Sequence, residues 1–267
     1  QAQQYYHKAV EIADTTDSAQ LRLLARVYGQ LGESYIHLNL SQIASEMHKM
    51  QSYYGKKVHS LSIELDGLCK QAECLSKQKN YDSAVVINKY CEEQYRKNGL
   101  KTDADACLKT LANLHVFLKK YDVARSYFHR YENESGLVDE EFRIVPIRNR
   151  EYYYLSKGHY YYGLGILDSA LMFYYRLLEV NDTLCKKVAS RSIYRAYRKM
   201  GKKDSVIKYQ SKHIALIRKH DLATQVKQLQ ELQSHFDITK EREHTRREKE
   251  RAEEKSRQMW LAVFGAA

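Results

Sequence analysis

The sequence predicts an all-α protein built from stacked pairs of helices, and three observations support this. A single proline, Pro146, and 11 glycines in 267 residues leave few signals for the turns of a β-protein. Helix-favouring residues recur throughout, and a hydrophobic content of 43% is enough to bury a core. One short segment also recurs at a spacing that is typical of repeated helical hairpins.

The recurring segment is a tetrapeptide, which reads YDSA at 81–84, YDVA at 121–124, LDSA at 167–170 and KDSV at 203–206. Its last residues lie 40, 46 and 36 positions apart, and Ala44 in LSQIA lies another 40 before the first copy. We expect each copy to begin the second helix of a pair. Asn or Asp near the junction should act as helix caps and turn formers.

Each first helix is expected to carry a small residue at a close helix contact and a larger one a turn later. In chain order these pairs are Gly32 with Tyr35, Ala72 with Leu75, Ala112 with His115 and Gly158 with Tyr161. The fifth unit departs from this pattern, with Tyr194 in the small position. In the second helices the tetrapeptide alanine is the close contact, followed a turn later by an aromatic residue at Phe128 and Tyr174.

These residues resemble the tetratricopeptide repeat (TPR) family. LGESY at 31–35 is similar to its first-helix signature, and YDSAVVINKYC and LDSALMFYYRLL are similar to its second helix. The units are longer than the family's ~34 residues, and most lack its unit-ending proline. The resemblance implies a right-handed superhelix over residues 1–220, with about five and a half helix pairs because the opening AQQYYHKA has second-helix spacing.

Such a superhelix has a concave groove, which we expect to be lined by first-helix residues beside the small positions. The candidate ligand-binding residues are Lys109, Asn113, Tyr152, Ser156, His159, Tyr162, Arg191, Arg195 and Arg198. Their order along the chain predicts a groove that is basic towards its C-terminal end.

Lys109 and Asn113 lie four residues apart, as in peptide-binding TPR proteins, where such a pair clamps a terminal carboxylate. The next unit has Leu155 and His159 at the partner positions instead of an asparagine. We therefore favour a general anion site, in which Lys109, His159, Arg191 and Arg195 supply convergent donors.

Tyrosines cluster at 152–154 and 160–162 on one predicted helix, so they must point to different sides of it. Tyr154 and Tyr161 fit the packing stripe. Tyr152, Tyr162 and Tyr160 are the candidates for rings that contact a peptide or a sugar. Core filling is the favoured reading of the cluster as a whole.

The segment 184–220 contains twelve Lys or Arg and one acidic residue, Asp204. This surplus equals the net charge of the whole protein, +11. It indicates either a solvated helical surface or a surface for an anionic partner. Nucleic acid is an alternative partner, although the basic and aromatic residues are not interleaved as a stacking platform requires.

The sequence contains no His-Glu-x-x-His, no phosphate-binding glycine loop and no nucleophile elbow. Its five cysteines lack zinc-site spacing and are interpreted as buried thiols. We therefore expect no enzymatic activity, no cofactor and no metal site.

Beyond the repeats, three further segments are predicted. Residues 221–238 have a heptad-like stripe from Leu222 to Phe236, which either caps the solenoid and relays signals or forms a homodimer. Residues 239–258 are a charged helical spacer. Residues 259–267, from Met259 onwards, begin a transmembrane helix at Trp260, with a frayed C-terminal helix as the alternative.

This order of segments resembles bacterial membrane-anchored regulators that carry helical repeats outside the membrane. The resemblance implies a non-enzymatic sensor scaffold in signal transduction that binds a protein or peptide, here one of acidic character. It favours an extracytoplasmic repeat domain, whereas the unpaired cysteines and flanking basic residues favour the cytoplasm. A soluble nucleic-acid-binding adaptor and a glycan-binding solenoid are the alternatives.

Overall fold

The computed structural model describes residues 6, 17–137, 144, 150–222 and 224. Regular structure in these residues is helical, which confirms the predicted all-α class. The predictions for the opening segment, the spacer at 239–258 and the transmembrane start at 259–267 lie outside the described residues, as does most of 221–238.

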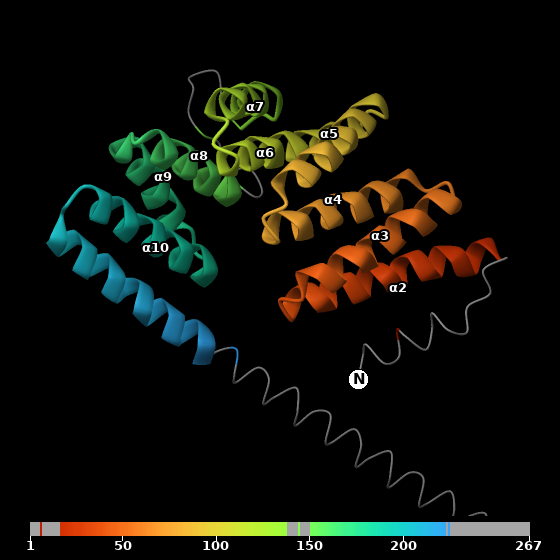
Figure 1. The fold of residues 1–267 in the computed structure, drawn as a ribbon, viewed down its shortest axis with the longest axis horizontal. Coiled ribbons are helices and arrows are strands. Elements are labelled where there is room, and N and C mark those ends of the chain that lie inside the picture. Colours follow the sequence, from red (N-terminus) through yellow and green to blue (C-terminus); the bar gives the residue numbers. More distant parts are fainter. Residues whose placement is uncertain (1–5, 7–16, 138–143, 145–149, 223, 225–267) are drawn as a thin grey trace, which may run out of the picture.

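The described helices follow one another as antiparallel pairs (Figure 1). They are α2 (Ser18–His37), α3 (Ser41–Lys57), α4 (Leu61–Lys77), α5 (Tyr81–Lys97), α6 (Lys101–Phe117), α7 (Tyr121–Glu134), α8 (Arg150–Leu164), α9 (Leu167–Glu179), α10 (Thr183–Lys199) and a helix over residues 203–222. The helices α5, α7, α9 and the one at 203 begin at the repeated tetrapeptide, so the predicted register is confirmed.

Seven of the turns between consecutive helices contain a residue in the left-handed region. These residues are Asn39, His59, Lys79, Gly99, Lys119, Gly165 and Gly201. In the first of them the N–H of Leu40 donates to the carbonyl of Tyr35 at 2.9 Å, which closes the end of α2. Because the same turn recurs, α3 to α7 begin 20 residues apart.

The expected side-chain caps occur at only some junctions. The side chain of Asn80 accepts from the N–H of Ser83, whereas α3, α7 and α9 begin without a side-chain cap. Asp82, Asp122 and Asp168 lie instead in the first turns of their helices, where the helix dipole favours a negative charge.

The small residues of the first helices allow close contacts within each pair. A Cβ atom on Gly32 would lie 2.5 Å from Nε2 of His48, and one on Gly158 would lie 2.4 Å from Cε1 of Tyr174. These distances are too short for a side chain, so glycine is required there unless the ring moves. In the fifth unit Tyr194 is half-buried and contacts the ring of His213.

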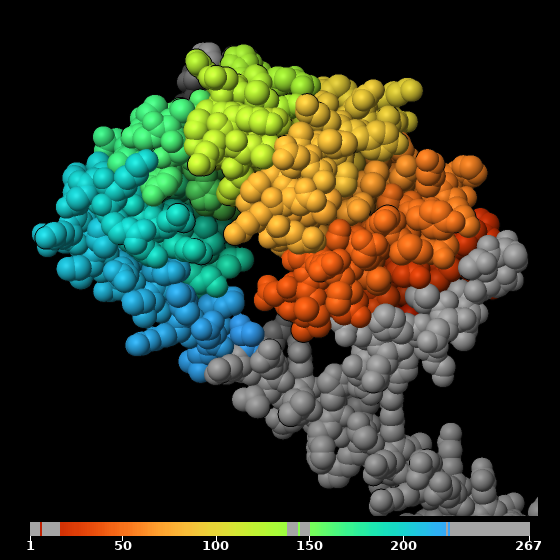
Figure 2. All heavy atoms as spheres, viewed as in Figure 1, coloured from red at the N-terminus to blue at the C-terminus, as the bar shows by residue number. Residues whose placement is uncertain are grey.

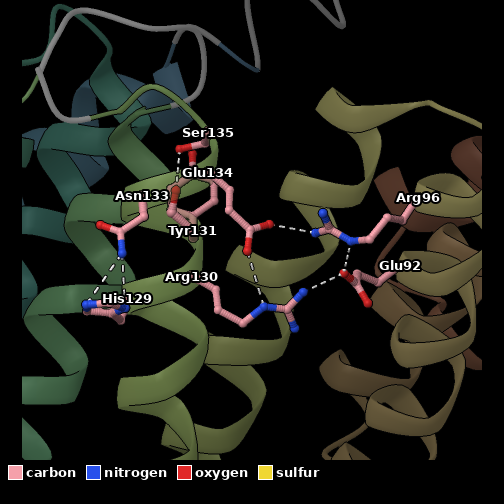
Figure 3. Close-up of polar contacts among 8 residues, drawn as sticks. All are labelled: Glu92, Arg96, His129, Arg130, Tyr131, Asn133, Glu134 and Ser135. Atoms are coloured by element: carbon pink, nitrogen blue, oxygen red, sulfur yellow. Dashed lines mark hydrogen bonds and ion pairs between the residues drawn. The ribbon is translucent and has the colours of Figure 1, made fainter.

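The neighbouring second helices α5 and α7 are joined by a four-charge network (Figure 3). Arg96 donates to Glu92 on its own helix and to Glu134 on α7, each at 2.8 Å. Arg130 on α7 donates back to Glu92 at 3.0 Å and lies 3.5 Å from Glu134. Each arginine therefore binds one carboxylate on its own helix and one on the neighbouring pair.

The stacked pairs curve around a hollow. Figure 2 shows this hollow between the orange and red surface of the first pairs and the teal surface of α10. The first helices α2, α4, α6, α8 and α10 contribute most of the residues that line the pockets of the groove. The predicted solenoid of stacked helix pairs is thereby confirmed.

Candidate functional site

Three pockets follow the first helices along the groove. The N-terminal pocket, of about 650 Å³, lies among α2, α3 and α4. The central pocket, of about 460 Å³, lies among α4, α6 and α8. The C-terminal pocket, of about 380 Å³, lies among α6, α8 and α10. We refer to them by these names.

The central pocket brings together four of the nine candidate residues. Lys109 and Asn113 lie on α6, and Tyr152 and Ser156 lie on α8. Nζ of Lys109 lies 5.3 Å from the ring centre of Tyr152, which is 60% exposed. Oδ1 of Asn113 is buried without a hydrogen-bond partner in the described residues. The pocket thus offers a cation, an open acceptor and an exposed ring.

Three further candidates, His159, Tyr162 and Arg195, line the C-terminal pocket. The Tyr162 ring has Lys199 Nζ at 5.0 Å and Arg195 at 5.9 Å from its centre. Nδ1 of His159 is buried, and within the described part of the chain it has no hydrogen-bond partner. This pocket is therefore aromatic, with cations at its edge.

Burial shifts the pKa of two of these groups. It lowers the pKa of Lys109, an effect that the nearby carboxylate of Glu151 opposes. Burial and the charge of Arg195 lower the pKa of His159 to about 4. At neutral pH His159 is therefore a neutral donor rather than a cation, and its place among the donors of an anion site stays a prediction.

The last two candidates, Arg191 and Arg198, are exposed on α10 and line neither the central nor the C-terminal pocket. With Arg195 they have the spacing of one helix face. Among the described residues no carboxylate lies within ion-pair distance of these three arginines. They form an uncompensated basic stripe, which we call the α10 stripe.

The opposite end of the groove has a different charge. Glu33, Asp66 and Asp103 line the N-terminal pocket. Glu33 pairs with Lys70 at 2.7 Å, and Asp66 accepts from Gln51 at 2.7 Å. Carboxylates on α2, α4 and α6 thus line the N-terminal pocket, and those of Asp66, Glu73 and Asp103 also line the central pocket. The three arginines without a carboxylate partner in the described residues lie on α10.

The tyrosine cluster divides between core and groove. Tyr154 is buried, and Tyr161 stacks on Phe173 with ring centres 5.7 Å apart. The prediction that Tyr160 is exposed is wrong, since it is 8% exposed and packs edge-to-face on Phe128. The glycine on this face of α8 is Gly163, which lies against Tyr121 of α7, and the tyrosine pattern alone did not reveal this contact.

Sequence reasoning missed several groove residues. Phe117, at the end of α6, is 41% exposed and lines the C-terminal pocket, with its ring centre 6.0 Å from that of His159. Cys69 and Cys107 line the central pocket. An exposed aromatic in the turn before YDVA was the available signal for Phe117, whereas the two cysteines meet only through the repeat register.

Two further features are absent from the residues that the structure describes. These residues contain no group of three His, Cys, Asp or Glu side chains arranged to hold a metal ion. In the same residues no helix combines the length and the apolar character that crossing a bilayer requires.

No family model and no curated protein matches the sequence. Solved structures do match the fold. The crystal structure of BtubC (BKLC) from P. vanneervenii has a TM-score of 0.58 at 13% identity and covers 82% of this chain and 89% of that one. The putative kinesin light chain with nearly identical TPR-like repeats from Podosopora anserina has a TM-score of 0.50 at 14% identity, covering 73% and 95%. The chain therefore has the fold of TPR-like repeat proteins.

Proposed function

We propose that the chain is a non-enzymatic scaffold that binds an extended acidic peptide or protein segment in its groove. The TPR-like fold supports an interaction role. The observation that carries the proposal is the α10 stripe, which lies beside a pocket with an exposed aromatic edge and lacks carboxylate partners in the described residues. Charged donors without partners favour an anionic ligand.

The two pockets supply different parts of the recognition. The central pocket presents Lys109 and the open acceptor Oδ1 of Asn113, which suit the end or the backbone of a peptide. The C-terminal pocket presents Phe117 and Tyr162, which suit an apolar side chain. The α10 stripe then binds acidic side chains. The neutral His159 contributes a hydrogen bond and no charge.

Charge reversal in the groove tests the proposal. The probe is a fluorescein-labelled glutamate-rich peptide with a free C-terminus, and its affinity is measured by fluorescence anisotropy. Arg191→Glu with Arg195→Glu should weaken binding by more than about tenfold, since each desolvated charged contact contributes more than about 1 kcal/mol. Circular dichroism should show unchanged helicity.

The matched control is Lys208→Glu with Lys212→Glu on the helix 203–222, because both side chains are exposed and have the same spacing. An equal loss of affinity in both double variants would mean that net charge alone governs binding and would overturn the groove assignment.

Competition by arbitrary duplex DNA with a steep salt dependence would favour the nucleic-acid alternative. A large loss of affinity when the C-terminus of the peptide is amidated would indicate that Lys109 and Asn113 bind its terminal carboxylate.

We further propose that this scaffold is the sensor part of a bacterial membrane-anchored regulator, with residues 221–238 as a relay or homodimer contact. The support is the order of segments in the sequence and the run from Met259, which lie outside the described residues. Flotation with liposomes tests it. Removing residues 259–267 should abolish flotation while peptide affinity and the melting temperature stay unchanged. Flotation that persists without them would contradict the proposal.

A further inference from the structure

Three cysteines from three consecutive helices meet beside the central pocket. Cys69 lies on α4, Cys91 on α5 and Cys107 on α6. Sγ of Cys69 lies 4.0 Å from Sγ of Cys107, and both residues line the pocket. Cys91 is fully buried in the same apolar cluster. The other two cysteines, Cys74 and Cys185, line none of this pocket.

The arrangement favours one reactive sulfur. Hydrogen bonds from the thiols of Cys107 and Cys91 lower the pKa of Cys69, against the effect of its burial. Hydrogen bonding to Cys69 and burial raise the pKa of Cys107. A thiolate is the nucleophile in cysteine chemistry, so Cys69 is the sulfur best prepared to attack. It is also half-buried, whereas Cys107 is 3% exposed.

We propose that Cys69 and Cys107 are a dithiol site that reacts with hydroperoxides and closes to a disulfide between α4 and α6. The pocket of about 460 Å³ provides access for a small peroxide. A disulfide requires a sulfur–sulfur distance of about 2.05 Å, so the two sulfurs must approach by roughly 2 Å. A disulfide also needs Cα atoms within about 7 Å of one another, so the bond would form through side-chain rotation together with a shift of α4 towards α6.

The reaction balances with one hydroperoxide. The Cys69 thiolate attacks the terminal peroxide oxygen, the O–O bond breaks, and the departing alkoxide or hydroxide takes up a proton to become an alcohol or water. Cys69 is then a sulfenic acid. The Cys107 sulfur loses its proton and attacks Sγ of Cys69, the S–O bond breaks, and water leaves. The two thiols have supplied two electrons, and the hydroperoxide is the oxidant.

The disulfide would act on the groove directly. It would tie α4, which carries Lys70, to α6, which carries Lys109, and both lysines line the central pocket. The backbones of α6 and α8 already approach one another more closely than those of α4 and α6. Closing the bond therefore draws together the less tightly joined pair of first helices. The reactivity itself does not depend on the proposed peptide binding.

Mass spectrometry of the full chain tests the site. Reduced protein is treated with one equivalent of hydrogen peroxide or tert-butyl hydroperoxide. The intact mass should fall by about 2 Da as two thiols form a disulfide. Peptide mapping should place the cross-link between Cys69 and Cys107. Cys185→Ser, which changes a half-buried cysteine on α10, is the matched control and should react as the wild type does.

Two variants identify the roles. Cys69→Ser should prevent the mass loss, and Cys107→Ser should leave a sulfenic acid at Cys69 that dimedone captures. Circular dichroism at 222 nm checks that both fold. Should Cys69→Ser fail to fold, the dimedone adduct in Cys107→Ser still tests the attacking sulfur. A wild-type cross-link to Cys91, purely intermolecular disulfides, or thiols that stay reduced would each overturn the proposal.

Discussion

The second helices α5 and α7 place different side chains at one position of the repeat. Asn88 and Phe128 each lie four residues after the tetrapeptide alanine, and both are buried. Asn88 donates to the carbonyl of Ala84 on its own helix at 2.9 Å. Phe128 packs edge-to-face against Tyr153 and Tyr160 from the next pair. The same position of the repeat is thus filled by a polar side chain in α5 and by an aromatic side chain in α7.

The same contrast holds for the neighbouring pairs. His48 on α3 occupies this position in the N-terminal half and bonds to Gln51 on its own helix at 2.9 Å. Tyr174 on α9 occupies it in the C-terminal half, where it packs on Gly158 and on the ring of His159. In α3 and α5 this position carries a polar side chain that bonds within its own helix, although Nε2 of His48 has no partner among the described residues. In α7 and α9 it carries an aromatic ring that packs against α8. Stability should therefore depend more on the later repeats.

Replacing the side chain at the shared position by alanine tests most directly whether the two halves are packed differently. Phe128→Ala should cost about 3–5 kcal/mol because it leaves a cavity among aromatic rings. Asn88→Ala should cost about 1 kcal/mol, because it removes a hydrogen bond within one helix and leaves few contacts unmade. Urea unfolding followed by circular dichroism measures both. Equal costs would show that the two halves are not packed differently.

The second prediction concerns how the stability of the C-terminal half changes with pH. The pKa of His159 in the folded protein is about 4, below the ordinary value of 6.5. The stability that its neutral ring contributes is complete above pH 6.5 and is lost as the pH falls from 6.5 towards 4. The loss is at most about 1.4 kcal/mol for each pH unit.

His159→Gln should therefore make the melting temperature less sensitive to pH between 6.5 and 4. The matched control is His37→Gln, which changes an exposed histidine at the end of α2 in the N-terminal half. A pH profile that His159→Gln leaves as steep as that of the wild type would mean that the ring is not buried in its neutral form.

The helix pairs could be predicted from sequence because their signal is local. The tetrapeptides mark where α5, α7 and α9 begin, and the small residues at Gly32 and Gly158 mark the close contacts. The turns were harder to predict from the sequence, because Lys79 and Lys119 adopt a positive φ without the glycine or asparagine that normally indicates it. Their conformation is fixed by the helices on both sides.

The candidate site was harder to predict because it depends on curvature. Helical spacing placed Lys109, Asn113 and Tyr152 on one face, and the structure brings them into one pocket. Spacing did not reveal that Arg191 lies outside both pockets or that burial leaves His159 uncharged. The pairing of Cys69 with Cys107 likewise requires the offset between neighbouring repeats, which no short motif encodes.

The four-charge network of Glu92, Arg96, Arg130 and Glu134 has a mechanical consequence. It joins α5 to α7, whereas the groove is formed mainly by the first helices of the same pairs (Figure 3). The network resists separation of the two second helices, because each arginine binds carboxylates on both of them. These side chains are partly exposed, so dissolved salt weakens their ion pairs. The salt sensitivity of the contact between these neighbouring pairs is thereby set by side chains that line none of the three groove pockets.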